Sequence, residues 1–422
     1  MTTATRAEGA ADPQEGRQLT RAPRRRLLYL AGGLFLLLVV VRLISGEDAL
    51  TSGQVVSTAV AVTVPLALVG LGGLVAERAG VVNIGLEGMM ILGTWGAGWA
   101  GYQWGWAAAI VGGVLFGMVG GLLHAVATVT FSVDHVISGV AINILALGTV
   151  RFLSEALYDG VEGGGPSQSP TLSSRQPDFT LPGFSSGPNW LGGLEAKHWP
   201  VVSDLAGVLR GLTTNIGLLT LVTALLVVGV YLLLWQTPFG LRLRSCGENP
   251  TAADSLGVPV YRMKYIAVVA SGALAGLGGV SLVFAANFYL QNQTNNRGYI
   301  GLAAVIFGNW RPGGMVAGAA LFGYADAMQR VAEQAIPALL LLVAILLAAV
   351  AVWQFRVGRQ IQATVATGVA VASLIGYLSI DELPDSLVSF TPHLITLLVL
   401  SLASQRLRPP RADGLVWRRG EQ

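Results

Sequence analysis

Two polar side chains interrupt an otherwise apolar stretch at residues 73–90, GLVAERAGVVNIGLEGMM. Asn83 and Glu87 are four residues apart, so they share one face if the stretch is helical. Polar groups at membrane depth are costly and usually line a bundle interior or a water-filled pathway. We therefore expect both to face a solute pathway, the alternative for Glu87 being a structural hydrogen bond. The preceding pair, Glu77 and Arg78, is predicted to form a solvated cytoplasmic turn.

Other reactive residue types are too sparse for catalysis. The single cysteine, Cys246, excludes an internal disulfide, and the four histidines form no His-x-x-x-His pair of the kind that binds zinc. Neither lysine, Lys197 or Lys264, follows a glycine, so the chain lacks the Gly-Lys-Ser/Thr loop that holds ATP phosphates. We expect no catalytic residues, no metal and no cofactor in this chain.

The composition identifies the environment in which these residues must be positioned. Hydrophobic residues make up 53% of the 422 positions and charged residues only 12%, where soluble domains carry about 25% charged residues. This excludes a typical cytosolic enzyme, and the apolar content excludes a disordered chain. The net charge of +3 is not taken as a sign of nucleic acid binding, because basic residues in membrane proteins gather in cytoplasmic loops.

Apolar segments recur along the whole chain, and a spanning helix needs about 20 residues. The predicted fold is therefore an all-α, polytopic bundle of about 12 transmembrane segments (10 to 12), of which the shortest is a broken or half-spanning helix. The segments lie at 27–41, 55–76, 84–104, 106–130, 135–154, 215–236, 265–287, 299–310, 313–331, 337–355, 361–380 and 390–404.

The arginines set the orientation, because cytoplasmic loops collect basic residues. Arginines cluster before the first helix, within 237–264, in the turn at 356–359 and in the tail after 404. Alternating the crossings places all four clusters on one side, which makes both termini cytoplasmic. The predicted regions are a cytoplasmic tail (1–26), N-terminal helices (27–154), an extracytoplasmic loop (155–214), C-terminal helices (215–404) and a second cytoplasmic tail (405–422).

The cytoplasmic loop 237–264 contains signals for a short helix of its own. Asn249 is a good N-cap, Pro250 suits the first helical position and Gly257 suits the left-handed position that ends a helix. A helix of about seven residues is marginal alone. We therefore expect it to dock onto a partner, the alternative being a purely structural loop helix. A second turn, Asn309-Trp310-Arg311-Pro312-Gly313-Gly314, places Asn309 near the membrane boundary.

Five segments in this order resemble one family of permeases: ERAGVVNIGLEGMM, VISGVAINILALG, GENPTAADSLGV, SGALAGLGG and YIGLAAVIFGNWRPGGMVAGAALFGYADAMQ. Together they are similar to the permease subunits of ABC importers for branched-chain amino acids, simple sugars and nucleosides. The nucleoside-type permeases, which work with a lipoprotein that binds substrate, look most similar. The resemblance covers about 55–335 and 390–420. Residues 337–380 depart from it and look like an inserted helical hairpin.

The resemblance implies a role for the short cytoplasmic helix. In such importers a coupling helix lies in a groove of an ATP-binding subunit. That subunit would supply the ATP-binding site that this chain lacks. The residues carried over to this role are Asn249, Pro250, Ala252, Ala253, Asp254 and Gly257. The implied partners are a second, related permease subunit, two ATP-binding subunits, an extracytoplasmic substrate-binding lipoprotein and the lipid bilayer, but no nucleic acid.

The resemblance also supplies candidates for the substrate pathway, namely Asn83, Glu87, Asn143 and Asn309. It implies import of nucleosides or related small polar solutes across the cytoplasmic (inner) membrane of a prokaryote. Simple sugars and branched-chain amino acids are the alternative substrates.

A proton- or sodium-coupled secondary transporter is the rival mechanism, since Glu87, Asp134 and His135 could relay protons. A membrane-embedded enzyme is disfavoured because no nucleophile and base, or metal ligands, cluster in the sequence.

Overall fold

The computed structural model describes residues 23–185, 189–379 and 407–420. The described part is mostly helical, with one two-stranded antiparallel sheet. The first 22 residues of the predicted N-terminal tail and the predicted crossing at 390–404 lie outside the described residues.

Helices of the first half are α1 (Pro23–Ser45), η1 (Asp48–Thr51), α2 (Gly53–Arg78), α3 (Leu86–Trp104), α4 (Trp106–Ala125), the π-helical turn η2 (Val126–Thr130) and α5 (His135–Tyr158). The loop that follows contains β1 (Asp178–Phe179), α6 (Trp190–Glu195), α7 (Val202–Thr213) and β2 (Ile216–Gly217). The second half contains α8 (Leu218–Gln236), α9 (Pro238–Glu248), α10 (Pro250–Ser255), α11 (Val260–Ala286), α12 (Arg297–Phe307), α13 (Pro312–Val331), η3 (Glu333–Ala335), α14 (Ile336–Arg356) and α15 (Gln360–Ser379).

The predicted polytopic helical bundle is confirmed at the level of its class. Among the described residues, seven helices are long and apolar enough to cross a membrane: α2, α4 with η2, α5, α8, α11, α14 with η3, and α15. Helix α12 has only 11 residues and spans about 16 Å at 1.5 Å per residue, roughly half of the hydrocarbon core. This agrees with the prediction of a short helix at 299–310, while the total of 10 to 12 crossings stays a prediction.

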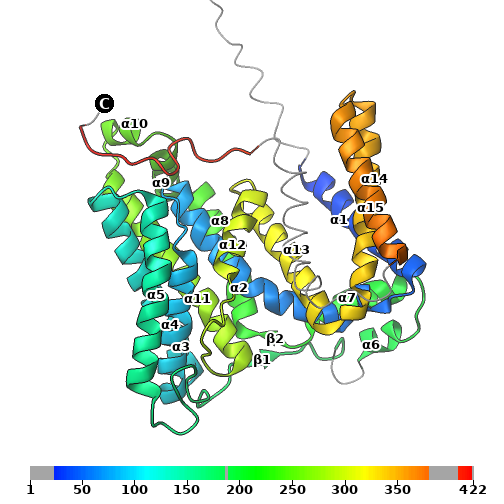
Figure 1. The fold of residues 1–422 in the computed structure, drawn as a ribbon, viewed down its shortest axis with the longest axis horizontal. Helices are drawn as coiled ribbons and strands as arrows, with labels where there is room; N and C mark the ends of the chain where they lie inside the picture. The colour runs from blue at the N-terminus through cyan, green and yellow to red at the C-terminus, as the bar shows by residue number, and fades with distance from the viewer. Residues whose placement is uncertain (1–22, 186–188, 380–406, 421–422) are drawn as a thin grey trace, which may run out of the picture.

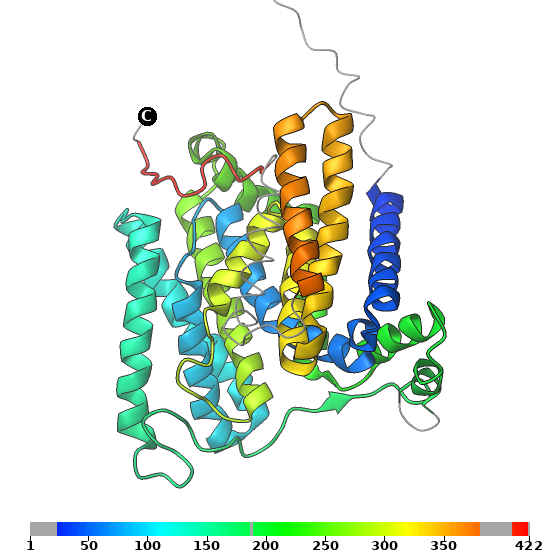
Figure 2. The same ribbon diagram turned by 45° about the vertical axis from the view of Figure 1, so that its right-hand side comes forward.

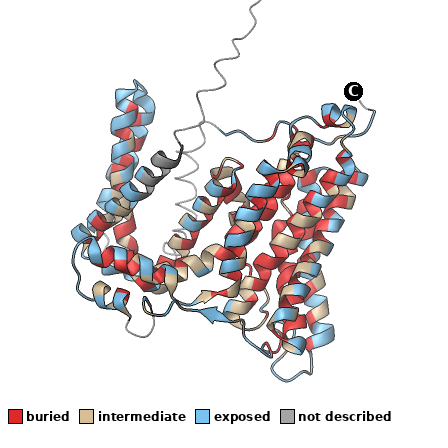
Figure 3. Ribbon diagram, turned by 180° about the vertical axis from the view of Figure 1, so that it is seen from behind, coloured by how far each residue is buried: buried red, intermediate tan, exposed pale blue. Residues whose placement is uncertain are grey.

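The centre of the bundle is built by α2, α3, α4 and α11 (Figure 1). In α2, 78% of the apolar 18-residue stretch that could span the membrane is buried inside the protein, against 22% of the corresponding stretch in α8. Buried residues follow the facing sides of the bundle helices, as Figure 3 shows. Trp95 is 1% exposed and packs against Tyr158 and Phe116, so it belongs to this core.

Glycine allows α4 and α11 to approach closely. A Cβ on Gly117 would lie 2.3 Å from the carbonyl oxygen of Gly272, and one on Gly276 would lie 2.3 Å from that of Gly113. No other residue fits at such a distance. The glycines spaced four apart on each helix therefore form a backbone contact of the kind that small residues allow in membranes.

The two ends of the bundle differ in character. Helices α9 and α10, residues 407–420 and the turn between α14 and α15 lie at one end, whereas α6, α7 and the small sheet lie at the other (Figure 2). Helix α7 lies in the second half of the predicted loop 155–214. It packs against α2, and its buried Asp204 pairs with Arg42 of α1 at 3.0 Å.

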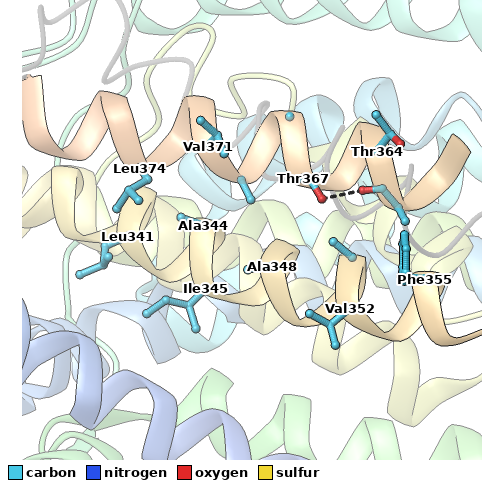
Figure 4. A pocket seen from close by; sticks show the side chains of 14 residues that line it. Leu341, Ala344, Ile345, Ala348, Val352, Phe355, Thr364, Thr367, Val371 and Leu374 are labelled. Carbon is cyan, nitrogen blue, oxygen red and sulfur yellow. Dashed lines mark hydrogen bonds between the residues drawn. The ribbon is translucent and has the colours of Figure 1, made fainter. Parts of the chain in front are cut away.

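The segment predicted to be an inserted hairpin is indeed a pair of helices, α14 and α15, packed side by side. An apolar groove of about 780 Å³ follows the pair and is lined by side chains such as Leu341, Ile345, Phe355 and Val371 (Figure 4). Helix α1 contacts α14, so the hairpin packs beside the N-terminal helix and away from the centre of the bundle.

Candidate transport and coupling sites

Glu87 is buried at the point where α3 begins beside α12. Its side chain accepts hydrogen bonds from the Thr294 hydroxyl (2.6 Å), the Asn296 amide (3.1 Å) and the Gly298 amide (2.6 Å). Backbone amides at the start of a helix have no partner within that helix, and an anion there is favoured by the helix dipole. Glu87 therefore caps α12 from a different helix.

Asn143 connects α5 to the same region. Its side-chain oxygen accepts a hydrogen bond from the Gly88 amide at 2.7 Å, and its nitrogen donates to the Ile84 carbonyl at 3.0 Å and the Tyr299 hydroxyl at 2.8 Å. The side chain uses both polar atoms on neighbouring segments. Asn143 thus joins α5, the start of α3 and α12.

Asn83 is fully buried but lies in the non-helical segment between α2 and α3. It therefore does not share a helix face with Glu87, because the helix begins only at Leu86. Its side-chain nitrogen donates to the Ser271 hydroxyl at 2.9 Å, whereas its oxygen is a buried acceptor with no partner among the described residues.

Asn309 has different contacts from those of Asn83, Glu87 and Asn143. It occupies the turn between α12 and α13 with a φ of 51°, and its oxygen accepts a hydrogen bond from the Arg408 amide at 2.7 Å. The structure thus gathers Asn83, Glu87 and Asn143 around residues 83–88 and places Asn309 against the C-terminal segment. A role of any of the four in binding substrate stays a prediction.

A run of polar residues that was not among the predicted site residues completes the buried group. Residues 291–296, Gln-Asn-Gln-Thr-Asn-Asn, connect α11 to α12 and supply Thr294 and Asn296 to Glu87. The following Arg297 is buried and pairs with Asp326 of α13 at 3.2 Å. Six consecutive amide and hydroxyl side chains between two apolar segments were the signal that could have identified it.

The prediction that Glu77 and Arg78 form a solvated turn is wrong. Glu77 is 3% exposed and accepts a hydrogen bond from the Trp310 indole. Arg78 donates to the Trp310 carbonyl from Nε at 3.0 Å and from Nη2 at 2.5 Å. The partner lies more than 230 residues away in the chain, so nothing in the local sequence indicates it.

The residues that favoured a proton relay also have structural partners. Asp134 caps α5 by accepting hydrogen bonds from the Val136 and Ile137 amides. His135 accepts one from the Val82 amide at 3.3 Å. Within the described residues, no three His, Cys, Asp or Glu side chains gather as a metal site.

The predicted short helix exists as α10. The Asn249 side chain accepts a hydrogen bond from the Ala252 amide at 3.0 Å, Pro250 occupies the first turn and Gly257 follows with a φ of +80°. Ala253 is buried against the protein. Leu256, by contrast, is 85% exposed, which leaves a large apolar side chain at the tip of the loop.

Cys246 precedes this helix, at the buried side of α9. Its thiol donates to the Arg242 carbonyl at 3.2 Å. Burial raises the pKa of the Cys246 thiol to about 11. Because the thiolate is the reactive form, this cysteine is unreactive near neutral pH.

Comparison with known proteins agrees with the motifs around both groups of residues. The family model described as "Branched-chain amino acid transport system / permease component" matches residues 55–352. The match includes α10 and all four predicted pathway residues. It runs through most of α14, so the departure from the family that was predicted to begin at 337 begins only after residue 352. No solved structure matches the chain.

Among curated proteins, the chain is similar to the guanosine ABC transporter permease protein NupQ of Bacillus subtilis, with 36% identity over 63% of this chain and 78% of the relative. It is 30% identical to the nucleoside ABC transporter permease protein NupC of Lactococcus lactis, over 83% of this chain and 92% of the relative. It is 33% identical to the putative glucose ABC transporter permease protein TsgC13 of Haloferax volcanii, over 66% and 77%. The family match spans more than half of the chain, and the helical bundle with its separately capped α10 agrees with it. The chain therefore belongs to the family described as "Branched-chain amino acid transport system / permease component".

Proposed function

We propose that this chain is the membrane-spanning subunit of an ABC importer that carries nucleosides into the cell. The observation that carries the substrate class is the similarity to permeases named for guanosine and nucleosides over most of their length. The glucose permease among the relatives makes a simple sugar the second candidate.

ATP hydrolysis is proposed to take place on two separate ATP-binding subunits, with α10 as the coupling helix. Two features support this assignment. The chain has no Gly-Lys-Ser/Thr sequence and therefore no phosphate loop of its own. Helix α10 presents Ala252 and Leu256 outward, which suits insertion into a groove of a partner.

The proposed orientation places the α9–α10 end in the cytoplasm, together with both termini. Arginines cluster at this end in α9, in the turn at 356–359 and in residues 407–420, as the positive-inside rule requires. The opposite end, with α6 and α7, would then face a substrate-binding lipoprotein. The complete assembly would lie in the cytoplasmic membrane and contain a second permease subunit. This chain would cross the membrane 10 to 12 times.

In the proposed mechanism, the residues of the buried polar group hold the transmembrane helices in register. Glu87 and Asn143 fix the start of α12 against α3 and α5. A half-length helix with its start held in this way is a feature of transport pathways, where a cavity or protein shields the free backbone. Asn83, whose buried side-chain oxygen has no partner among the described residues, is the group proposed to meet a solute or a water.

Uptake by the complete complex tests the proposal. The chain is reconstituted in vesicles with the second permease subunit, the ATP-binding subunits and the substrate-binding lipoprotein of its complex, and entry of labelled guanosine is followed with ATP inside. We expect ATP-dependent uptake that is competed by unlabelled nucleosides and abolished when the ATP-binding subunit lacks its phosphate-loop lysine.

Two results would contradict the proposal. Competition by glucose or leucine but not by nucleosides would replace the substrate class. Uptake that continues without ATP hydrolysis and collapses with an uncoupler would instead identify a secondary transporter.

A further inference from the structure

The C-terminal segment 407–420, here called the strap, has no part in the function as described so far. It contains no regular helix or strand and runs across the end of the bundle that carries α9 and α10 (Figure 1). An extended segment keeps one course only where specific contacts hold it. Its contacts therefore indicate what it does.

The first half of the strap is attached to the end of the bundle. The Arg408 amide donates to the Asn309 side chain at 2.7 Å, and the Ala412 amide donates to the Gly247 carbonyl at 2.8 Å. Ala412 is 5% exposed. The strap is thereby fixed both to the turn between α12 and α13 and to the end of α9.

The second half of the strap grips α10. The Trp417 indole donates to the Thr251 hydroxyl at 3.1 Å, and the Arg419 guanidinium pairs with Asp254 at 3.2 Å. Thr251 and Asp254 are three residues apart and therefore lie on the same side of a helix. Two side chains of the strap thus hold one face of α10.

Apolar packing supports the same attachment. The Trp417 ring packs against the buried cluster of Cys246, Ala253, Val260 and Met263. Its centroid lies 5.2 Å from that of Tyr261, whose hydroxyl also accepts a hydrogen bond from the Arg419 amide at 3.2 Å. Trp417 therefore closes a small core beneath α10.

The contacts leave the other side of α10 open. Ala252, Ser255 and Leu256 are exposed, and none of the hydrogen bonds described here between the strap and α10 reaches them. A lid would cover the side chains that a partner must contact. This segment instead supports a helix of six residues, a length at which a helix is unstable by itself.

We propose that the strap positions the coupling helix: Trp417 and Arg419 hold α10 so that Ala252 and Leu256 face the ATP-binding subunit, and the Asn309 contact ties α10 to the turn between α12 and α13. The inference rests on the proposed coupling role of α10. It adds a further connection, besides α9 and α11, through which movement of the membrane helices reaches the ATP-binding subunit.

The first test compares strap variants in the reconstituted complex. Trp417→Ala and Arg419→Glu are measured beside Leu415→Ala, a matched control in the same segment, because Leu415 is 59% exposed. The readout is the number of guanosine molecules imported per ATP hydrolysed. We expect this ratio to fall about fivefold or more in the first two variants, since each loses a polar contact to α10, and to stay at the wild-type value in the control.

A second measurement reports on the position of α10 without any transport. Ala252→Cys is spin-labelled in the full chain; the native thiol of Cys246 is buried and does not compete. The label should become more mobile when Trp417→Ala or Arg419→Glu is added, and should not respond to Leu415→Ala. The Arg419 side chain is 72% exposed, so its variant leaves the folded core intact even if Trp417→Ala does not.

The two measurements separate the possible failures. An unchanged coupling ratio and unchanged label mobility in both strap variants, in a complex whose wild type shows ATP-driven uptake, would overturn the positioning role. Absence of ATP-driven uptake in the wild type would overturn the proposed function, and the label mobility would then decide separately whether the strap holds α10.

Discussion

The carboxylate of Glu87 accepts a hydrogen bond from the backbone amide of Gly298 at 2.6 Å, although the two residues lie on α3 and α12. With the bonds from Thr294 and Asn296, one side chain receives three donors. The short helix α12 therefore depends on a residue that is more than 200 positions away. This relationship makes Glu87 part of the scaffold as well as a candidate for the pathway.

Replacing Glu87 tests this scaffold role. Glu87→Gln keeps the shape but points an amide group at backbone donors, and leaving a buried donor without a partner costs about 1–3 kcal/mol. We expect a lower melting temperature of the purified permease together with reduced uptake. If Glu87 contacts only the substrate, the variant will melt like the wild type and lose uptake alone.

Substitution of Gly276 tests the backbone contact between α4 and α11. In Gly276→Ala the new Cβ would lie 2.3 Å from the Gly113 carbonyl oxygen, so the two helices must separate, at a cost of roughly 1–3 kcal/mol or more. We expect poor yield of folded protein and a lower melting temperature. Gly229→Ala in α8 is the control because it meets no atom within 4 Å, and an equal loss in both variants would contradict the explanation.

Structural features that depend on residues close together in the chain could be predicted from the sequence. The N-cap Asn249, Pro250 and Gly257 predict the limits of α10, because capping is decided within one turn of the chain. The length of the apolar segment at 299–310 likewise predicts that α12 is too short to cross. The apolar segments as a whole predict the helical bundle.

Features that depend on distant partners were not readable. The sequence shows Glu77 and Arg78 as a charged pair, but Trp310 determines their burial. The sequence shows Trp417 in a basic tail, but its position under α10 depends on Thr251 and Tyr261. Hydrogen bonds across more than 150 residues follow from the packing of the bundle, which local patterns do not specify.

Breaking the ion pair between Arg42 and Asp204 tests how α1 is attached to α7. The Asp204 side chain is 0% exposed and that of Arg42 is 8% exposed. Leaving a buried charge without a partner costs about 3–5 kcal/mol. Arg42 keeps Asp48 as a second partner, so Asp204→Ala should cost less than that but still lower the melting temperature clearly. The exposed pair between Arg151 and Glu155 provides the control, because Glu155→Ala should cost less than about 1 kcal/mol. Equal effects would show that Asp204 does not stabilise this contact.

The strap should bind less firmly as the pH rises, because of Asp413. Burial raises the pKa of Asp413 to about 7, although Lys264 and Arg78 nearby act in the opposite direction, and its charge faces that of Glu77. A carboxyl group with a raised pKa favours the docked state when protonated. Its contribution is therefore complete below its ordinary pKa of about 4 and is lost as the pH passes through about 7.

A spin label on Leu415→Cys measures this dependence on pH in the full chain. We expect the mobility of the label to increase between about pH 6 and pH 8 in the wild-type background. Asp413→Asn cannot ionise, so the label should stay immobile across that range. A pH response that persists in Asp413→Asn would assign the titration to another group. No response in either background would show that the Asp413 carboxyl does not control docking of the strap.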